Sequence, residues 1–173
     1  SIVPRGQAGG MTIYLPEEDR SYLSKRYLED EITALLGGRV AESLVLGDIS
    51  TGASNDIQRA SSLAHKMVAT YGMSEKLGPV CFDSGSGEVF IGRTMSQGRA
   101  YSETVAAEID AEVQAIIAES RSRCEAILTE QRDKLETVAQ YLLDHETMEA
   151  DVFAKVFTEP GAEEFAPYRQ QKD

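Results

Sequence analysis

The run from Ser50 to Ile57, Ser-Thr-Gly-Ala-Ser-Asn-Asp-Ile, contains the residue whose type and position most suggest chemistry. Its small residues predict a tight loop, and Asn55, with Gln58 three residues later, predicts the start of a helix. Asp56 would then occupy the first helical position, where the positive end of the helix dipole favours an ionised carboxylate. Such a carboxylate on a rigid element can bind zinc. Spacing alone favours the simpler alternative, in which Asp56 only complements the dipole.

Glu42 and the two histidines are weaker candidates for a site. Glu42 ends the run Gly-Gly-Arg-Val-Ala-Glu; it can orient a metal ligand or pair with Arg39, and an isolated glutamate is more simply a solvated or paired side chain. His65 and His145 lie far apart in the sequence, and neither belongs to an H-E-x-x-H motif. We assign neither histidine a catalytic role. The chain also contains no phosphate-binding loop and no nucleophile elbow.

The composition limits the classes of function. The chain has 173 residues, which fits one domain, and 42% of them are apolar. Its 17 basic and 29 acidic side chains give a net charge of −12, which repels nucleic-acid phosphates and anionic lipid headgroups. No run approaches the roughly 18 apolar residues that a membrane-spanning helix needs. We therefore expect a folded domain that binds no nucleic acid and makes no direct contact with a membrane surface.

Apolar residues recur at helical spacing along most of the chain, which predicts a mainly α fold. From about Ser102 a long helical region runs on with a break near Thr129–Glu130, and we expect its two parts to form a long antiparallel helical hairpin. The helices predicted before it are Glu17–Leu36, Val40–Leu46 and one from Asn55 to Tyr71, with Gly37-Gly38 as the stop between the first two.

Two segments predict minor β structure. The residues from Gly10 to Leu15 read as a short strand, and Val80–Phe82 with Glu88–Ile91 read as a hairpin. Residues 158–173 contain two prolines and several charges without a period, so we expect a disordered tail.

Several of these stretches, in the same order, resemble the peptidase domain of the FtsH family of ATP-dependent, membrane-anchored zinc metalloproteases. The most specific is Ser50–Ile57, and the similarity covers residues 1–157. The resemblance implies a helical metallopeptidase domain with an edge strand, N-terminally incomplete, over residues 1–157. The other matching stretches are Ile2–Gly6, Leu36–Glu42, Gly72–Pro79 and Glu88–Arg93.

The resemblance also implies a zinc site. The family binds zinc through both histidines of an H-E-x-x-H helix and through a later aspartate, which falls on Asp56 here. The glutamate of that motif acts as general base, and Glu42 is implied to support the site without binding the metal. The motif is expected shortly before Ile2 and is absent from these residues. We therefore predict that these 173 residues alone neither hold zinc tightly nor cleave peptides.

The family's substrates and partners follow from the same resemblance. The residues Gly10, Met11, Thr12, Ile13 and Tyr14 match the edge strand that would bind unfolded polypeptides by strand addition, with a purely structural edge as the alternative. The resemblance further implies a homo-hexamer, an ATPase module that uses ATP and Mg, and N-terminal membrane anchors, all outside these residues. The domain would lie on the cytosolic, stromal or matrix side.

Two alternatives remain open at this point. The first is a catalytically inactive FtsH-like assembly or scaffold module, because the family includes members that have lost the zinc motif. The second is a helical regulatory domain similar only by descent. An intact H-E-x-x-H motif upstream would indicate a protease, and a degenerate one a scaffold.

Overall fold

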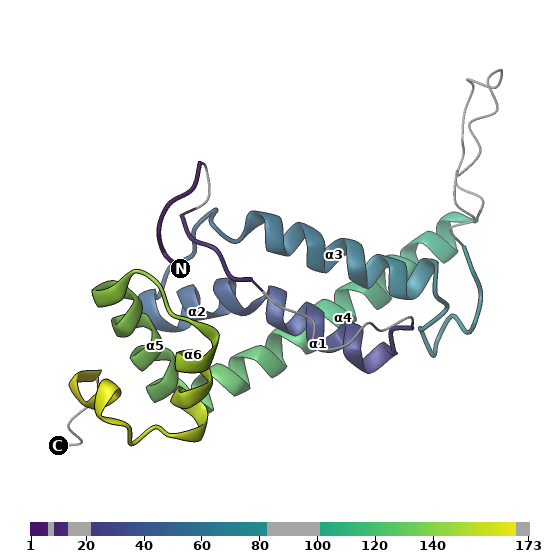
Figure 1. Cartoon of the computed structure of the whole chain (residues 1–173). Coiled ribbons are helices and arrows are strands. Elements are labelled where there is room, and N and C mark those ends of the chain that lie inside the picture. The colour runs from purple at the N-terminus through teal and green to yellow at the C-terminus, as the bar shows by residue number, and fades with distance from the viewer. Residues whose placement is uncertain (7–8, 14–21, 83–100, 169–173) are drawn as a thin grey trace. The chain divides into compact units, whose positions relative to one another are not determined.

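The computed structural model describes residues 1–6, 9–13, 22–82 and 101–168, and these are mainly helical, as predicted (Figure 1). No strand is formed within these ranges. Contacts divide the chain into two compact units, one of Ser21–Glu125 and one that combines Ser1–Arg20 with Ala126–Asp173. The helices are α1 (Lys25–Leu35), α2 (Gly37–Leu46), α3 (Ser54–Ala69), α4 (Glu103–Glu130), α5 (Arg132–His145), α6 (Ala150–Thr158) and the 3-10 helix η1 (Glu163–Tyr168).

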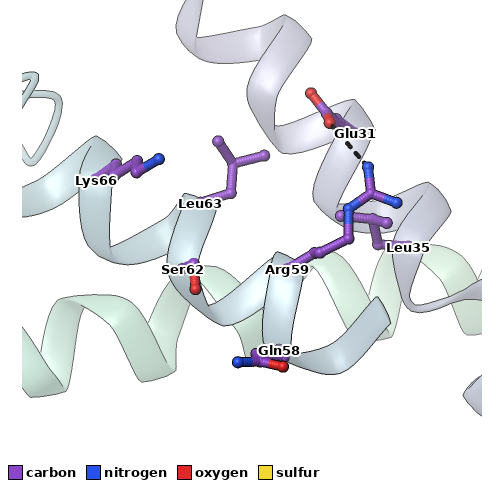
Figure 2. A pocket seen from close by; sticks show the side chains of 7 residues that line it. All are labelled: Glu31, Leu35, Gln58, Arg59, Ser62, Leu63 and Lys66. Atoms are coloured by element: carbon purple, nitrogen blue, oxygen red, sulfur yellow. Dashed lines mark ion pairs between the residues drawn. The ribbon is translucent and has the colours of Figure 1, made fainter. Parts of the chain in front are cut away.

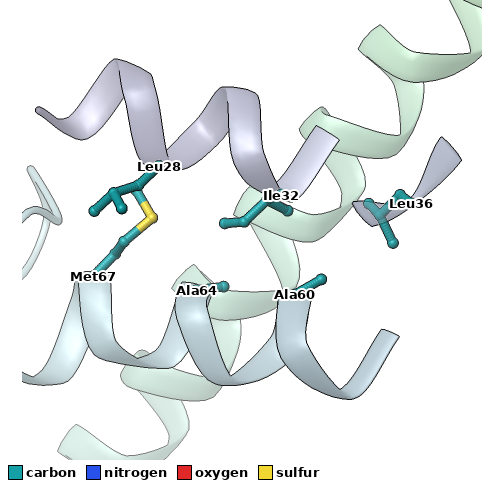
Figure 3. Packing of buried hydrophobic residues seen from close by; sticks show 6 residues of the cluster. All are labelled: Leu28, Ile32, Leu36, Ala60, Ala64 and Met67. Carbon is teal, nitrogen blue, oxygen red and sulfur yellow. The ribbon is translucent and has the colours of Figure 1, made fainter. Parts of the chain in front are cut away.

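The core of the Ser21–Glu125 unit forms where α1 lies antiparallel to α3. Leu28 faces Met67, and Ile32 faces Ala64, so the two helices approach closely over the small alanine side chain (Figure 3). Three residues of α4 pack against this cluster: Val113, Ile116 and Ile117. The apolar face of α3 that carries Ala60, Ala64 and Met67 thus packs in the core of this unit.

The boundary between α1 and α2 differs from the prediction. Gly37 and Gly38 do not stop the helical path but begin α2, and Leu36 alone separates the two helices. Leu36 keeps a right-handed helical conformation, its N–H donates to Ile32 O at 3.1 Å, and its O accepts from Val40 N–H at 3.0 Å. Glycine tolerates this helical backbone as well as a stop, because it has no Cβ to restrict it.

The first helix begins later than predicted. The hydroxyl of Ser24 accepts a hydrogen bond from Tyr27 N–H at 3.2 Å, which caps the helix and sets its start at Lys25. Part of the predicted beginning, residues 17–21, lies outside the described residues.

The predicted β structure is not confirmed. Residues 10–13 form no strand, and Tyr14 lies outside the described residues. Residues 80–82 form no strand either; instead Phe82 N–H donates to Ala69 O at the end of α3, at 2.8 Å. The second strand of the predicted hairpin, Glu88–Ile91, lies outside the described residues.

The second unit is built on α5. The break predicted near Thr129–Glu130 is present, since α4 ends at Glu130 and α5 begins at Arg132. The long antiparallel hairpin is not confirmed: α5 packs against α6 and η1. Phe165 of η1 is buried there with its ring edge towards Tyr141, so ordered structure continues past residue 157 to residue 168.

The amino-terminal residues join this second unit. Ile2 N–H and the Ser1 hydroxyl both donate to Glu146 O, at 2.9 and 3.2 Å, where α5 ends. None of the helices in the described ranges combines the length and the apolar character needed to cross a membrane.

Candidate functional site

Asp56 lies in the first turn of α3, although not at the predicted position. The helix begins at Ser54 with Ala53 before it, so Asp56 is its third residue and Asn55 is not the cap. The start is set by backbone bonds: Ser54 N–H donates to Thr51 O and Ile57 N–H to Ala53 O, both at 3.0 Å. The capping prediction was wrong because this turn, closed over the buried Ala53, starts the helix two residues earlier.

The carboxylate of Asp56 is accessible. Its side chain is 48% exposed, and its Oδ1 lies 3.9 Å from Nη1 of Arg59. The other end of the same guanidinium, Nη2, lies 4.0 Å from Oε1 of Glu31 on α1. Exposed ion pairs of this length contribute little, so Arg59 does not lock the carboxylate away from a metal. The sequence held a signal for this pair, because residues three apart on a helix are neighbours.

Glu42, in the middle of α2, holds the loop that leads into α3. Its Oε1 accepts the Ser50 hydroxyl at 2.6 Å, and its Oε2 accepts Ser50 N–H at 3.1 Å. The hydroxyl of Ser50 in turn accepts Gly52 N–H at 3.1 Å. The Ser50 hydroxyl, then the Ser50 amide and to a smaller extent Arg39, hold the pKa of Glu42 below its ordinary value.

Glu42 thus holds the loop that precedes Asp56. Two roles were considered for Glu42: orienting a metal ligand or pairing with Arg39. The structure shows hydrogen bonds from Ser50 to Glu42, and Arg39 contributes as a nearby charge. Sequence reasoning missed Ser50 and Gly52 as members of this group. No periodic signal could have found them, because the contact joins residues eight apart across a reversal of the chain.

An open hollow of about 350 Å³ lies between α1 and α3 next to Asp56's ion-pair partner. Arg59 and Lys66 place positive charge along it, Glu31 opposes them, and Leu35 and Leu63 form its apolar part (Figure 2). Gln58 and Ser62 complete the lining. Arg59 both lines the hollow and pairs with Asp56.

The described residues hold no complete metal site. Among them, no three His, Cys, Asp or Glu side chains gather closely enough to hold an ion. His65 lies half-buried on α3, and exposed His145 stacks on Tyr141 at 4.2 Å between ring centroids. By donor chemistry, Asp56 fits one ligand of a zinc site, a carboxylate on a helix start, and further donors have to come from elsewhere.

The predicted substrate-binding residues lie in the other unit. Met11 N–H donates to Ser1 O at 2.8 Å, and Met11 O accepts from Ser1 N at 3.0 Å, so the hydrogen-bonding groups of Met11 are already used. A Cβ on Gly10 would lie 2.9 Å from Ser1 O, which explains a glycine at this close approach. Ile13 is exposed. Peptide binding by Gly10, Met11, Thr12, Ile13 and Tyr14 stays a prediction.

Comparison with known proteins identifies the family. The chain is 57% identical over 157 residues, 91% of its length, to the ATP-dependent zinc metalloprotease FtsH 1 of Thermoanaerobacter sp. (strain X514). It is 54% identical over 152 residues, 87% of its length, to FtsH of Bacillus subtilis (strain 168), and 44% identical over 160 residues, 92% of its length, to FtsH of Thermotoga maritima. It spans only 26%, 24% and 26% of these three relatives. The profile of peptidase family M41 matches residues 1–156, and the chain therefore belongs to peptidase family M41.

Proposed function

We propose that this chain is the zinc-peptidase domain of a longer ATP-dependent protease, with Asp56 as one of three zinc ligands. The observation that carries the proposal is the accessible Asp56 carboxylate in the first turn of α3. Asp56 follows a loop that is held by the hydrogen bonds of Ser50 to Glu42 and Gly52. It lies in the stretch where the FtsH family places its aspartate ligand. Relatives that share 44–57% of the aligned residues are named zinc metalloproteases.

The chain's own residues contribute binding and orientation to this site. Asp56 presents an accessible carboxylate from the first turn of α3. Glu42 and its partners hold the loop that precedes that turn. Bound zinc would polarise the scissile carbonyl and make its water a nucleophile near neutral pH. Two histidine ligands and a glutamate general base come from the whole protein outside these residues.

The remaining parts of the proposal concern the whole protein. It degrades unfolded membrane and soluble polypeptides, assembles as a homo-hexamer, and uses ATP and Mg in a separate module. It is anchored in a membrane through segments outside these 173 residues, with this domain on the cytosolic, stromal or matrix side. The strongly acidic charge of the chain, −12, supports an interaction with polypeptides in preference to nucleic acids.

The test replaces Asp56 in the whole protein. We expect Asp56→Ala to weaken zinc binding by at least about 100-fold, more than is usual for a residue that only supports a ligand. Zinc bound per chain and ATP-dependent cleavage of a permanently unfolded reporter protein measure the effect. Asp133→Ala is the matched control, because Asp133 is an exposed aspartate in the first turn of α5.

Asp133→Ala should leave both zinc binding and cleavage unchanged. Zinc binding and cleavage at the original level in Asp56→Ala would refute the ligand role. A whole protein that neither binds zinc nor cleaves the reporter without any substitution would instead establish the inactive assembly module.

A further inference from the structure

The hydroxyl of Ser50 is the centre of the hydrogen bonds around the loop before α3. It donates to Oε1 of Glu42 at 2.6 Å and accepts the N–H of Gly52 at 3.1 Å. The backbone N–H of the same residue donates to the second oxygen of the Glu42 carboxylate at 3.1 Å. One serine therefore ties the middle of α2 to the residues that lead into α3.

The space around Gly52 is fitted to this arrangement. A Cβ at Gly52 would lie 3.2 Å from the Ser50 hydroxyl and 3.7 Å from Oε1 of Glu42. The distance to the Ser50 hydroxyl is short, so a side chain at Gly52 would displace this hydroxyl, which accepts the Gly52 N–H. Gly52 thus belongs to the same group, because its lack of a side chain leaves room for the Ser50 hydroxyl.

The backbone between Gly52 and Asp56 links the hydrogen bonds of Ser50 to the start of α3. The amide of Gly52 is fixed by Ser50, Ala53 is buried, and Ser54 N–H donates to Thr51 O at 3.0 Å to open the helix. Asp56 follows in the first turn, so the direction of its side chain depends on where this loop places the start of α3. A metal ligand has to be held within about 0.5 Å of its productive position.

From these contacts we infer that Ser50 is a positioning residue for the metal ligand Asp56, acting through the relay from Glu42 to Gly52. This inference rests on the proposed function, because it takes Asp56 to be a zinc ligand. It adds Ser50 and Gly52 to the residues on which the site depends, neither of which touches the metal.

The first experiment measures the loop in the whole protein after zinc has been removed with a chelator. We expect Ser50→Ala to speed hydrogen exchange at the Gly52 amide by about tenfold or more, because this N–H loses its acceptor. Ser50→Thr keeps the hydroxyl and should restore slow exchange. Ser61→Ala is the matched control, since the Ser61 hydroxyl donates only to Ile57 O within α3, at 2.8 Å.

The second experiment measures zinc affinity in the same variants and in Gly52→Ala. Removing a group that supports a ligand typically costs about 10- to 100-fold in metal affinity, and we expect this loss for Ser50→Ala. Gly52→Ala should also bind zinc more weakly, while Ser50→Thr and Ser61→Ala should keep the original affinity. The loss for Ser50→Ala should come with the faster exchange at Gly52.

The outcomes separate this inference from the proposed function. If Asp56→Ala loses zinc while Ser50→Ala keeps both the original affinity and slow exchange at Gly52, the positioning role of Ser50 is refuted and the ligand role stands. If Asp56→Ala keeps zinc, the ligand role falls and this inference falls with it. Loss of zinc in Ser50→Thr as severe as in Ser50→Ala would also overturn the inference, because the hydroxyl would then not be the group that matters.

Discussion

The carboxylate of Glu42 makes the loop before α3 sensitive to acid. Its hydrogen bonds from Ser50 hold its pKa below the ordinary value of 4.5, so the folded loop favours the ionised form. The stabilisation is therefore complete above pH 4.5 and is lost as the pH falls through the lower folded value. We expect the amide chemical shifts of Ser50 and Gly52 to stay constant from neutral pH downward and to change with a midpoint below 4.5.

The variant Ser50→Ala supplies the comparison for this titration. It removes the largest contribution that lowers the pKa of Glu42, so the midpoint read at the Gly52 amide should move up towards 4.5. A midpoint at or above 4.5 in the unaltered chain would show that the Ser50 bonds do not favour the carboxylate.

The roles of Asp56 and Glu42 were predicted from the family that their runs resemble, since spacing alone favoured a simpler alternative for each, and both roles stay predictions. The bonds from Ser50 to Glu42 could not be predicted, because they depend on how the chain reverses after α2. The prediction of Asn55 as the helix cap was wrong for a related reason: a backbone turn at Thr51–Ser54 had already begun the helix.

Packing between helices α1 and α3 stabilises the Ser21–Glu125 unit. Leu28 is 1% exposed and packs against Met67, so Leu28→Ala removes buried apolar surface and leaves a cavity between two helices. The expected loss is about 2–5 kcal/mol in the free energy of unfolding. Urea denaturation followed by circular dichroism measures it. Leu46→Ala, at a side chain that is 73% exposed, should change the free energy far less.

An equal loss in the two leucine variants would mean that the α1–α3 contact does not stabilise the chain.

Helices such as α3 and α4 could be predicted because apolar residues recur on one face over several turns. The continuation from α1 into α2 could not be predicted, because glycine permits either a stop or a helix. The backbone hydrogen bonds of Leu36 keep the chain helical at this point. The predicted pairing of α5 with the preceding helix is not confirmed; periodicity shows that a face is apolar without showing which element covers it.

At the scale of the whole chain, resemblance predicted more than periodicity did. Family membership came from the order of short, unusual runs such as Ser50–Ile57, while the mainly helical fold class came from apolar periodicity, and both are confirmed. The division into two compact units was not predicted, because it depends on contacts between residues far apart, such as Ile2 with Glu146. Two prolines and several charges without a period also suggested a tail after residue 157, and Phe165 in this stretch is a buried residue.

Phe165 tests whether the carboxyl-terminal residues are a working part of the second unit. Its side chain is 1% exposed and lies edge-on to Tyr141, and Lys155 on α6 pairs with Glu164 at 3.4 Å beside it. Phe165→Ala should therefore lower the free energy of unfolding of this unit by about 3–5 kcal/mol and speed hydrogen exchange in α5, α6 and η1. Phe153→Ala is the control, because Phe153 is an exposed aromatic of the same unit and its loss should cost much less. If instead the two phenylalanine variants unfold alike and exchange in α5 is unchanged, η1 is an accessory to the unit and its core ends with α6.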